Sequence, residues 1–468
     1  MTDYQGLTYL DNAATTPMPE EVLAVIDEYY RFNKVNVHRG IYQLAGRVTS
    51  AYEAVREQIA QWLHAPQQES VVFTSGTTDA LNQVAFGYAQ PRLQPGDEII
   101  VSVLEHHSNL VPWQRVAAQT GARLRMVGMD SQGNLDYAQL AELINTHTKV
   151  VTLTMVSNVL GTVVDVAKVA QLVHQYDGIL VVDAAQAVAH LPIDVTAMDV
   201  DFLAFSGHKM FGPTGIGVLY GKLARLEEME PVRFGGEMVD LVTPTSATFQ
   251  PLPIRLEAGT PNVAGVLGLG AAVKYLEKQD FAATQKQEAR LMQFLLTELQ
   301  EVPEVKIYGP LDYQQRVGVV SFNVGKHHAH DVATILDASG VAVRAGHLCA
   351  EPLMQALNVS SVVRASFTFE NQIADLQRLV DAVEQVGRIL SWTIYKSYTK
   401  KLFWITLKTR WAMAKYPTQI VSGRCAIPNV ATRLRFMPKL TRNGSSNWVS
   451  RGRAVWSAWH RQVWWLRN

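Results

Sequence analysis

The sequence is poor in cysteine and has no long apolar segment. It contains 2 cysteines in 468 residues, too few for a disulfide framework, so we expect a reducing, cytoplasmic setting. No apolar run approaches the roughly 20 residues that a membrane-spanning helix needs. The first ten residues are polar, unlike a secretory signal peptide. The sequence therefore argues against a disulfide-stapled, secreted or membrane-spanning protein, and we expect no membrane partner.

Common nucleotide-binding and metal-binding motifs are also missing. There is no G-x-G-x-x-G and no Walker loop, so nothing supports a dinucleotide or nucleoside triphosphate site. His106 and His107 are adjacent, but no third ligand follows at a useful spacing. Three further histidines, at 327, 328 and 330, are better explained as a solvated loop before a helix. We therefore expect no metal site.

Charge and tryptophan are concentrated at the end of the chain. Lys and Arg equal Asp and Glu at 42 each, yet residues 391–468 hold 15 basic residues, no acidic residue and 8 of the 10 tryptophans. This composition suits a nucleic-acid or anionic-membrane surface. Helical periodicity is poor there, however, and the absence of acids favours a disordered, fused or out-of-frame extension. We expect no nucleic-acid partner.

The rest of the sequence predicts an α/β protein. Apolar strand-like runs alternate with helical patterns over residues 71–220, which is typical of a mostly parallel sheet with helices on both faces. A long amphipathic helix at residues 281–302, followed by short strands, predicts a smaller α+β domain. We expect an N-terminal segment at 1–15 that packs with the small domain, a large domain at 16–284, a small domain at 285–390 and an extension at 391–468.

Several predicted strands end in polar residues. Ligands in open α/β sheets bind outside the carboxyl ends of the strands, so these residues are expected to share one pocket. An acid and a lysine on neighbouring strand ends are the pair that pyridoxal phosphate needs, for its pyridinium nitrogen and its Schiff base. For that pair alone a surface salt bridge is the simpler explanation, but the recurrence favours a pocket. The residues are Thr77, His106, Asn158, Asp183 and Lys209.

Three other features suggest chemistry. A Ser-Gly-Thr-Thr turn at residues 75–78 joins a strand to a helix, as a phosphate cradle or as a plain helix cap. Cys349 follows Arg344 and His347, cationic neighbours that favour a reactive thiolate, although a lone cysteine is often a small buried apolar residue. Arg364 is suited to hold a carboxylate with two hydrogen bonds.

Together these motifs resemble the class V aminotransferase family of fold-type I pyridoxal phosphate enzymes, and within it the SufS/CsdA-type cysteine desulfurases. The resemblance runs from about residue 9 to residue 390. It implies a large domain with a mostly parallel sheet and a smaller α+β domain. The matching stretches are 9–19, 36–41, 75–79, 105–114, 156–162, 183–186, 205–217, 257–262, 344–352 and 364–366.

The resemblance implies a role for each residue around the cofactor. Lys209 would attach it covalently, Asp183 would face the pyridinium nitrogen, Gln186 would contact the ring hydroxyl and His106 would stack on the ring. The phosphate would be bound by Thr77, Thr78, Ser206 and His208, and by Thr260 of the neighbouring subunit of a homodimer.

The resemblance also implies the reaction. L-Cysteine would become L-alanine, with Lys209 moving the proton, and Cys349 would take the sulfur as a persulfide. A SufE- or SufU-like acceptor would then carry it to iron–sulfur assembly. Substrate contacts are implied for Asn158, Arg364, His38, Arg39 and Arg344. The alternatives are a selenocysteine lyase or another class V enzyme, which need not use the cysteine, and an inactive scaffold or nucleic-acid-binding fusion.

The family pattern ends before the basic extension, which predicts that the extension is dispensable. A chain truncated after Leu390 is expected to keep its desulfurase activity, measured as alanine formed from L-cysteine. A large loss of activity in a truncated protein that keeps its fold, shown by circular dichroism, would contradict this prediction.

Overall fold

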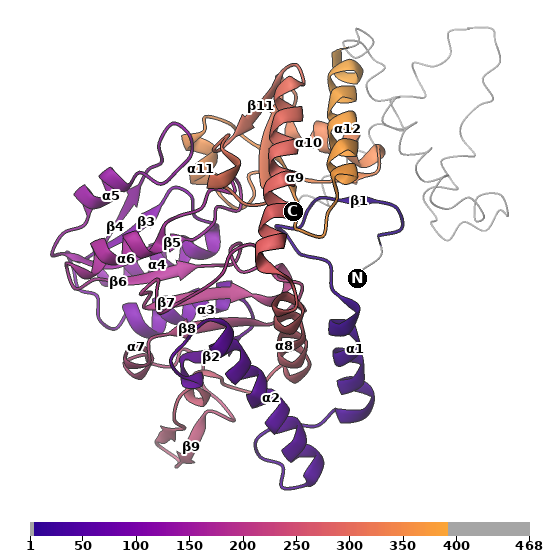
Figure 1. The fold of residues 1–468 in the computed structure, drawn as a ribbon. Coiled ribbons are helices and arrows are strands. Elements are labelled where there is room, and N and C mark those ends of the chain that lie inside the picture. Colours follow the sequence, from indigo (N-terminus) through magenta and orange to yellow (C-terminus); the bar gives the residue numbers. More distant parts are fainter. Residues whose placement is uncertain (1–3, 392–468) are drawn as a thin grey trace, which may run out of the picture. The chain divides into compact units, whose positions relative to one another are not determined.

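A computed structural model describes residues 4–391 of the chain (Figure 1). Its main sheet has seven strands in the order β2-β8-β7-β6-β5-β3-β4. The neighbours from β7 through β6, β5 and β3 to β4 are parallel, and β8 is antiparallel to both β7 and β2. The mostly parallel sheet predicted from the sequence is therefore confirmed. The strands are β2 (Val71–Thr74), β3 (Glu98–Ser102), β4 (Arg123–Val127), β5 (Thr148–Thr154), β6 (Ile179–Asp183), β7 (Phe202–Ser206) and β8 (Gly217–Gly221).

The central strands are covered on both faces. Every residue of β3, β6, β7 and β8 is buried, as expected when a parallel sheet lies between two helical layers. Ile99 and Val101 pack into one apolar cluster and Ile100 into another, because alternate side chains point to opposite faces. The helices around the sheet are α3 (Thr77–Gln83), α4 (Val111–Thr120), α5 (Tyr137–Leu143), α6 (Val166–His174), α7 (Leu223–Glu227) and α8 (Val263–Glu277).

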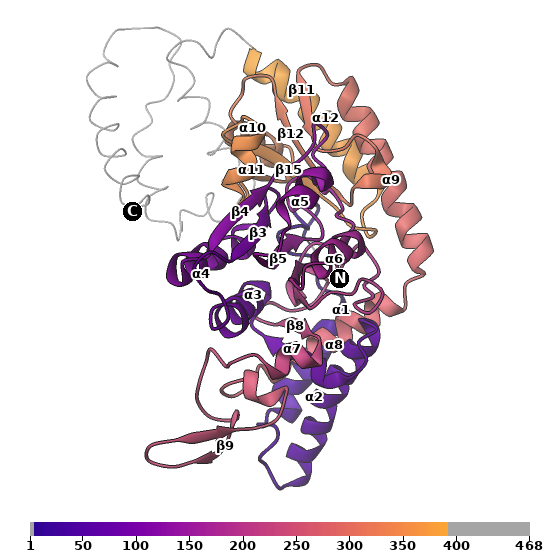
Figure 2. The ribbon, with the colours of Figure 1, turned by 90° about the vertical axis from the view of Figure 1, so that its left-hand side faces the viewer.

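Two further elements extend from the main sheet. Helices α1 (Glu20–Glu28) and α2 (Gln43–Trp62) both pack against α8. A hairpin of β9 (Val239–Val242) and β10 (Ala247–Phe249) projects away from the main sheet, as Figure 2 shows. Leu241 and Val242 of the hairpin are 63% and 61% exposed.

A second, four-stranded antiparallel sheet has the order β11-β12-β15-β14. The predicted amphipathic helix near it is α9 (Phe281–Glu301). β1 (Thr8–Tyr9) pairs with β13 (Val341–Ala342), and Asp11 bridges to Ser366, so the N-terminal segment lies against this sheet. The remaining elements are β11 (Val305–Tyr308), β12 (Val319–Val324), α10 (Ala329–Ala338), β14 (Arg344–Gly346), α11 (Glu351–Ala356), β15 (Val362–Ser366) and α12 (Ile373–Ser391).

Residues 4–391 contain no helix with both the length and the apolar character needed to cross a membrane. Within the same residues, no group of three or more His, Cys, Asp or Glu side chains is arranged to hold a metal ion. The basic extension expected at 391–468 lies, apart from its first residue, outside the described part of the chain.

Trp113 supports the loop that follows β3, and its removal is expected to be costly. It is fully buried in α4 and donates a hydrogen bond from Nε1 to Asn109 Oδ1 at 3.0 Å. We expect Trp113→Ala to lower the free energy of unfolding by about 3–5 kcal/mol, because it leaves a large cavity. Urea unfolding would measure the loss. The control is Phe281→Ala, a 40% exposed aromatic expected to cost about 1 kcal/mol or less; equal losses would contradict the prediction.

Candidate active site

Asp183 and Lys209 lie at the same edge of the main sheet. Asp183 is the last residue of β6, and its register partners are Thr154 on β5 and Ala204 on β7. Lys209 ends the short helical turn Gly207–Lys209 that follows β7. Asp183 is 3% exposed, and its Oδ1 accepts a hydrogen bond from Ala185 N at 2.9 Å. The predicted acid–lysine pair is thus brought to one pocket.

Burial controls the protonation of this pair. It raises the pKa of Asp183 and lowers the pKa of Lys209, and in each case the charge of the other residue opposes the effect. Transfer of a charge out of water is costly, so a buried amine loses its proton more easily. The neutral amine is the form that attacks a carbonyl carbon. Lys209 is therefore suited to act as a nucleophile and as a base.

Cys349 is exposed and lies between two buried residues, Leu348 and Ala350, in the loop that joins β14 to α11. Leu348 and Cys349 both have φ 55°, a left-handed conformation that is strained for residues with side chains. Two hydrogen bonds hold them: Asn158 Nδ2 donates to Leu348 O at 2.9 Å, and His107 N donates to Cys349 O at 2.8 Å. Burial lowers the pKa of Lys209, whereas the charges of Asp183 and Cys349 raise it. The thiol and the amine are thus within electrostatic reach.

His106 is held as a neutral ring. Its Nδ1 accepts a hydrogen bond from Ser108 N at 3.1 Å and lies 3.0 Å from Ser108 Oγ, which in turn lies 2.7 Å from Thr78 Oγ1. Burial, together with the charge of Lys209, lowers the pKa of His106 to about 4. With Nδ1 as an acceptor, Nε2 carries the proton. A neutral imidazole of fixed orientation can stack on an aromatic ring.

The residue before His106, Glu105, is the centre of a buried hydrogen-bond network. Glu105 is 1% exposed and accepts hydrogen bonds from Ser102 Oγ, from Asn109 Nδ2 at 2.6 Å and from Thr154 N at 3.0 Å. Burial nevertheless raises the pKa of Glu105 to about 8. Because Thr154 pairs with Asp183, the network joins the strand ends that carry His106 and Asp183.

The turn after β2 is packed tightly against β7 and β8. Thr77 N and Thr77 Oγ1 both contact Ser206 Oγ, at 2.8 and 2.7 Å. Gly76 has φ 148°, and a Cβ added to Gly217 would lie 2.5 Å from Gly76 Cα. Only glycine fits at Gly217 without moving the turn. The result is a cluster of hydroxyl and backbone N–H groups suited to an anion.

Two arginines converge on one carboxylate of the N-terminal segment. Arg364, 2% exposed on β15, donates from Nη1 to Asn158 O at 2.9 Å and from Nη2 to Asp11 Oδ1 at 3.0 Å. Arg344 also binds Asp11, from Nη2 to Oδ2 at 2.7 Å and from Nε at 3.1 Å. Arg364 Nε and Asn158 Oδ1 are buried and have no hydrogen-bond partner in the structure. One buried donor and one buried acceptor are thus left unpaired beside Asp11.

Two predicted cofactor residues contact the N-terminal segment. Gln186 is buried, and its Nε2 donates to Ala13 O at 2.7 Å. The backbone carbonyl of His208 accepts hydrogen bonds from Thr16 N at 2.9 Å and from Thr15 Oγ1 at 3.1 Å. Burial lowers the pKa of the His208 side chain. These contacts fix the positions of Gln186 and His208, which are close in the sequence to Asp183 and Lys209.

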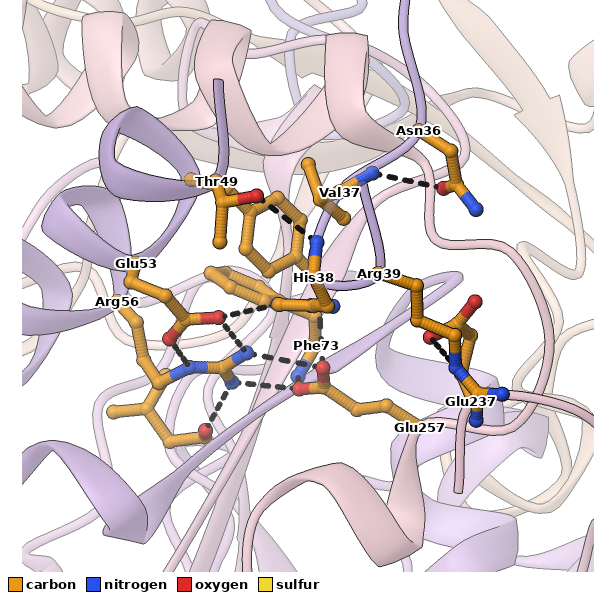
Figure 3. A network of polar contacts seen from close by, with 12 residues as sticks. Asn36, Val37, His38, Arg39, Thr49, Glu53, Arg56, Phe73, Glu237 and Glu257 are labelled. Atoms are coloured by element: carbon orange, nitrogen blue, oxygen red, sulfur yellow. Dashed lines mark hydrogen bonds and ion pairs between the residues drawn. The ribbon is translucent and has the colours of Figure 1, made fainter. Parts of the chain in front are cut away.

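Two predicted residues, His38 and Arg39, belong to a different cluster, drawn in Figure 3. His38 Nε2 lies 2.9 Å from Glu53 Oε1, and Arg39 Nε lies 3.2 Å from Glu237 Oε2. No contact that the structure gives for either residue involves Lys209, Asp183 or Cys349. Thr260 is exposed and lies three residues after Glu257. The contacts of His38 and Arg39 therefore lead away from Lys209, to Glu53 and Glu237.

The same cluster contains a buried ion pair that fixes these exposed residues (Figure 3). Arg56 is 1% exposed, and its Nη1 and Nη2 donate to Glu257 at 2.6 and 3.0 Å. Arg56 Nε also donates to Glu53 at 2.8 Å, and Glu257 accepts from Phe73 N at 2.6 Å. Burial of the ion pair anchors both the segment before Arg39 and the turn before Thr260.

Sequence reasoning missed several residues of the pocket. Asp11, Glu105 and Ser108 all lie in stretches that it singled out, at 9–19 and 105–114, but they were given no role. An acid directly before His106 was a visible signal for Glu105. Nothing local marks Asp11, whose partners are more than 300 positions away in the sequence.

The pocket fits pyridoxal phosphate. The buried acid Asp183 suits a pyridinium nitrogen, and the buried amine of Lys209 suits the aldehyde. The neutral imidazole of His106 suits the face of the ring. Hydroxyl and N–H groups of Thr77 and Ser206 suit the phosphate. The orphaned Arg364 Nε and Asn158 Oδ1 remain for a substrate.

Comparison with known proteins identifies the family. Residues 8–379 match the aminotransferase class-V family, and the chain belongs to this family. It is 47% identical over 379 residues to a probable cysteine desulfurase of Halalkalibacterium halodurans, covering 81% of this chain and 93% of that protein. It is 45% identical over 390 residues to a cysteine desulfurase of Dickeya dadantii, covering 82% and 93%.

Solved structures agree with the fold. The cysteine desulfurase CsdA of Escherichia coli superposes with a TM-score of 0.77 at 43% identity, covering 82% of this chain and 95% of that chain. A cysteine desulfurase of Thermococcus onnurineus NA1 gives a TM-score of 0.79 at 39% identity, with the same two coverages. The predicted fold type and family are thus confirmed.

The buried Glu105 predicts a pH dependence of stability. Its pKa of about 8 in the folded protein exceeds the value of about 4.3 in an unfolded chain. The folded state therefore holds an extra proton between these values, and this contribution is lost as the pH rises toward 8. We expect the stability of the wild type relative to Glu105→Gln to fall by roughly 1 kcal/mol per pH unit between pH 5 and 8.

Urea unfolding at several pH values would measure the difference. Glu142→Gln, an exposed acid on α5, is the control and is expected to follow the wild type. A constant difference between the wild type and Glu105→Gln from pH 5 to 8 would contradict the prediction.

Proposed function

We infer that this chain is a pyridoxal phosphate-dependent cysteine desulfurase that converts L-cysteine to L-alanine and leaves the sulfur on Cys349. The observation that carries the proposal is that Asp183 and Cys349 both lie within electrostatic reach of Lys209. Cysteine desulfurases that match over more than nine-tenths of their own length support the same activity.

The residues of the pocket divide the task of holding the cofactor. Lys209 would bind it covalently, Asp183 would face its ring nitrogen, and His106 would cover the ring. Gln186 would contact the ring hydroxyl, while Thr77, Thr78, Ser206 and His208 would bind the phosphate. Pyridoxal phosphate, when bound, supplies an electron sink for charge that develops on the substrate α-carbon.

Residues of this chain orient the substrate and move its proton. Arg364 and Asn158 bind the substrate through the donor and acceptor that are free in the pocket. The Lys209 amine takes the proton from the α-carbon, a role suited to an amine whose pKa is lowered by burial.

The sulfur transfer balances without an outside oxidant. The Cys349 thiolate attacks the substrate sulfur and forms the S–S bond of a persulfide. The carbon–sulfur bond breaks, its electron pair stays with carbon, and protonation of that carbon gives the methyl group of alanine. An exposed thiol can receive sulfur inside the pocket and present it to an acceptor.

We further propose that the enzyme is a cytoplasmic homodimer with large and small domains near residues 16–284 and 285–390. Thr260, His38 and Arg39 are exposed, rigidly held and separate from their own pocket, which suits residues that serve the partner's site. The exposed β9–β10 hairpin supplies apolar surface for such contact. A SufE- or SufU-like protein would accept the sulfur for iron–sulfur assembly, and L-selenocysteine is a second candidate substrate.

The decisive experiment adds L-cysteine to the purified enzyme and measures alanine and protein-bound persulfide. We expect Cys349→Ala to keep its bound cofactor, seen by its absorption, but to form less than about 1% of the wild-type persulfide, because the nucleophile is missing.

Cys425→Ala, which removes the second of the 2 cysteines, is the matched control and is expected to behave as the wild type. Undiminished persulfide in Cys349→Ala would refute the sulfur assignment. Bound cofactor without Cys349-dependent sulfur in the wild type would favour the selenocysteine lyase, to be tested with L-selenocysteine.

A further inference from the structure

Asp11 has an unusual position for a residue of an N-terminal segment. It is the single carboxylate shared by two arginines of the small sheet, Arg344 on β14 and Arg364 on β15. Its carboxylate takes three hydrogen bonds from Arg344 and one from Arg364, between 2.7 and 3.1 Å. Its side chain is 14% exposed, so these interactions are only partly screened by solvent.

The backbone fixes Asp11 before any ligand arrives. The preceding strand β1 pairs with β13, and Asp11 itself bridges to Ser366. Asn12 Nδ2 donates to Ser366 O at 2.9 Å, and Ala13 N donates to Ser366 Oγ at 2.9 Å. The carboxylate is therefore a permanent part of the arginine pair and not a mobile side chain that happens to rest there.

The charges of Asp11, Arg344 and Arg364, which together form the arginine corner, can be balanced by one further carboxylate. Two guanidinium groups and one carboxylate give a net charge of +1. Asp11 binds Arg344 at Nε and Nη2 but Arg364 only at Nη2, and the buried Arg364 Nε has no hydrogen-bond partner in the structure. A ligand with one carboxylate neutralises the corner, whereas a second carboxylate finds no uncompensated cation.

We propose that Asp11 is a specificity-determining residue: as the shared counter-ion of Arg344 and Arg364, it limits the pocket to substrates with one carboxylate. The inference rests on the proposed role of Arg364 in binding the substrate carboxylate. Asp11 does not touch the reacting atoms. It acts through the two arginines, by cancelling one charge and by orienting the free edge of Arg364.

The test compares two ligands that have no amine and so cannot react with the cofactor aldehyde as an amino acid does. 3-Mercaptopropionate has one carboxylate, and mercaptosuccinate has two. Binding to the holoenzyme would be measured by calorimetry in a reducing buffer. Asp11→Asn keeps the shape of the side chain and removes its charge, so we expect about tenfold tighter binding of 3-mercaptopropionate and a larger gain for mercaptosuccinate.

The preference between the ligands is therefore expected to shift by about tenfold toward the dicarboxylate, a change that a purely structural role would not produce. Asp337→Asn is the control: it removes one negative charge from an exposed position on α10 of the same part of the chain, and both affinities are expected to stay unchanged. Unchanged or weaker binding by a folded Asp11→Asn enzyme would overturn the inference.

Two more variants complete the experiment. The double variant Asp11→Asn/Arg344→Gln restores the net charge, so the ratio of its affinities for the two ligands is expected within about threefold of the wild-type ratio; a ratio that differs by more than that would overturn the inference even if Asp11→Asn alone does not fold. Arg364→Gln separates the two proposals. If it retains 3-mercaptopropionate, the proposed substrate site is wrong and the inference fails with it. If it loses the ligand while Asp11→Asn changes nothing, only the inference fails.

Discussion

The buried guanidinium of Arg364 joins three parts of the molecule. It belongs to the small sheet, donates to the Asn158 carbonyl that follows β5 of the main sheet, and donates to Asp11 of the N-terminal segment. A buried charge is stable only when it is paired and hydrogen-bonded, so the pocket forms only when all three parts are in place. Arg364 Nε is left unpaired. The same guanidinium therefore connects the three parts of the molecule and has a donor left for a ligand.

The main sheet imposes a second condition on the site. Parallel strands bring all their carboxyl ends to one edge, so Thr77, His106, Asn158, Asp183 and Lys209 meet although they are spread over the sequence. Their side chains are then set by contacts behind them. Glu105 spans β3 and β5 beneath His106, and Gly76 and Gly217 let the Thr77 turn approach β8 closely. The functional groups at these strand ends thus lie on rigid elements, whereas the Cys349 loop adopts a strained backbone.

The sequence predicted those features that depend on local pattern. Apolar runs that end in polar residues located the strands and the pocket residues at their ends, and the period of residues 281–302 located α9. Asp11 and Glu105 were missed because their importance comes from tertiary contacts. Asp11 matters only once β14 and β15 lie beside it, and Glu105 only once β5 covers it. The roles proposed for His38 and Arg39 are not visible in the contacts of the chain itself, because those contacts lead to Glu53 and Glu237.

The different exposure of the lysine and the cysteine follows from what each must do. Lys209 gains reactivity from burial, which favours its neutral amine, and so it belongs inside the pocket. The role proposed for Cys349 requires a thiol that can meet both the substrate and an acceptor, and Cys349 is exposed. Its left-handed backbone is held by Asn158 and His107, which follow the same strands that carry the substrate and cofactor groups. A loop that stores strain and is fixed by the pocket itself can present its thiol inward without being buried, and this is the geometry that a sulfur carrier requires.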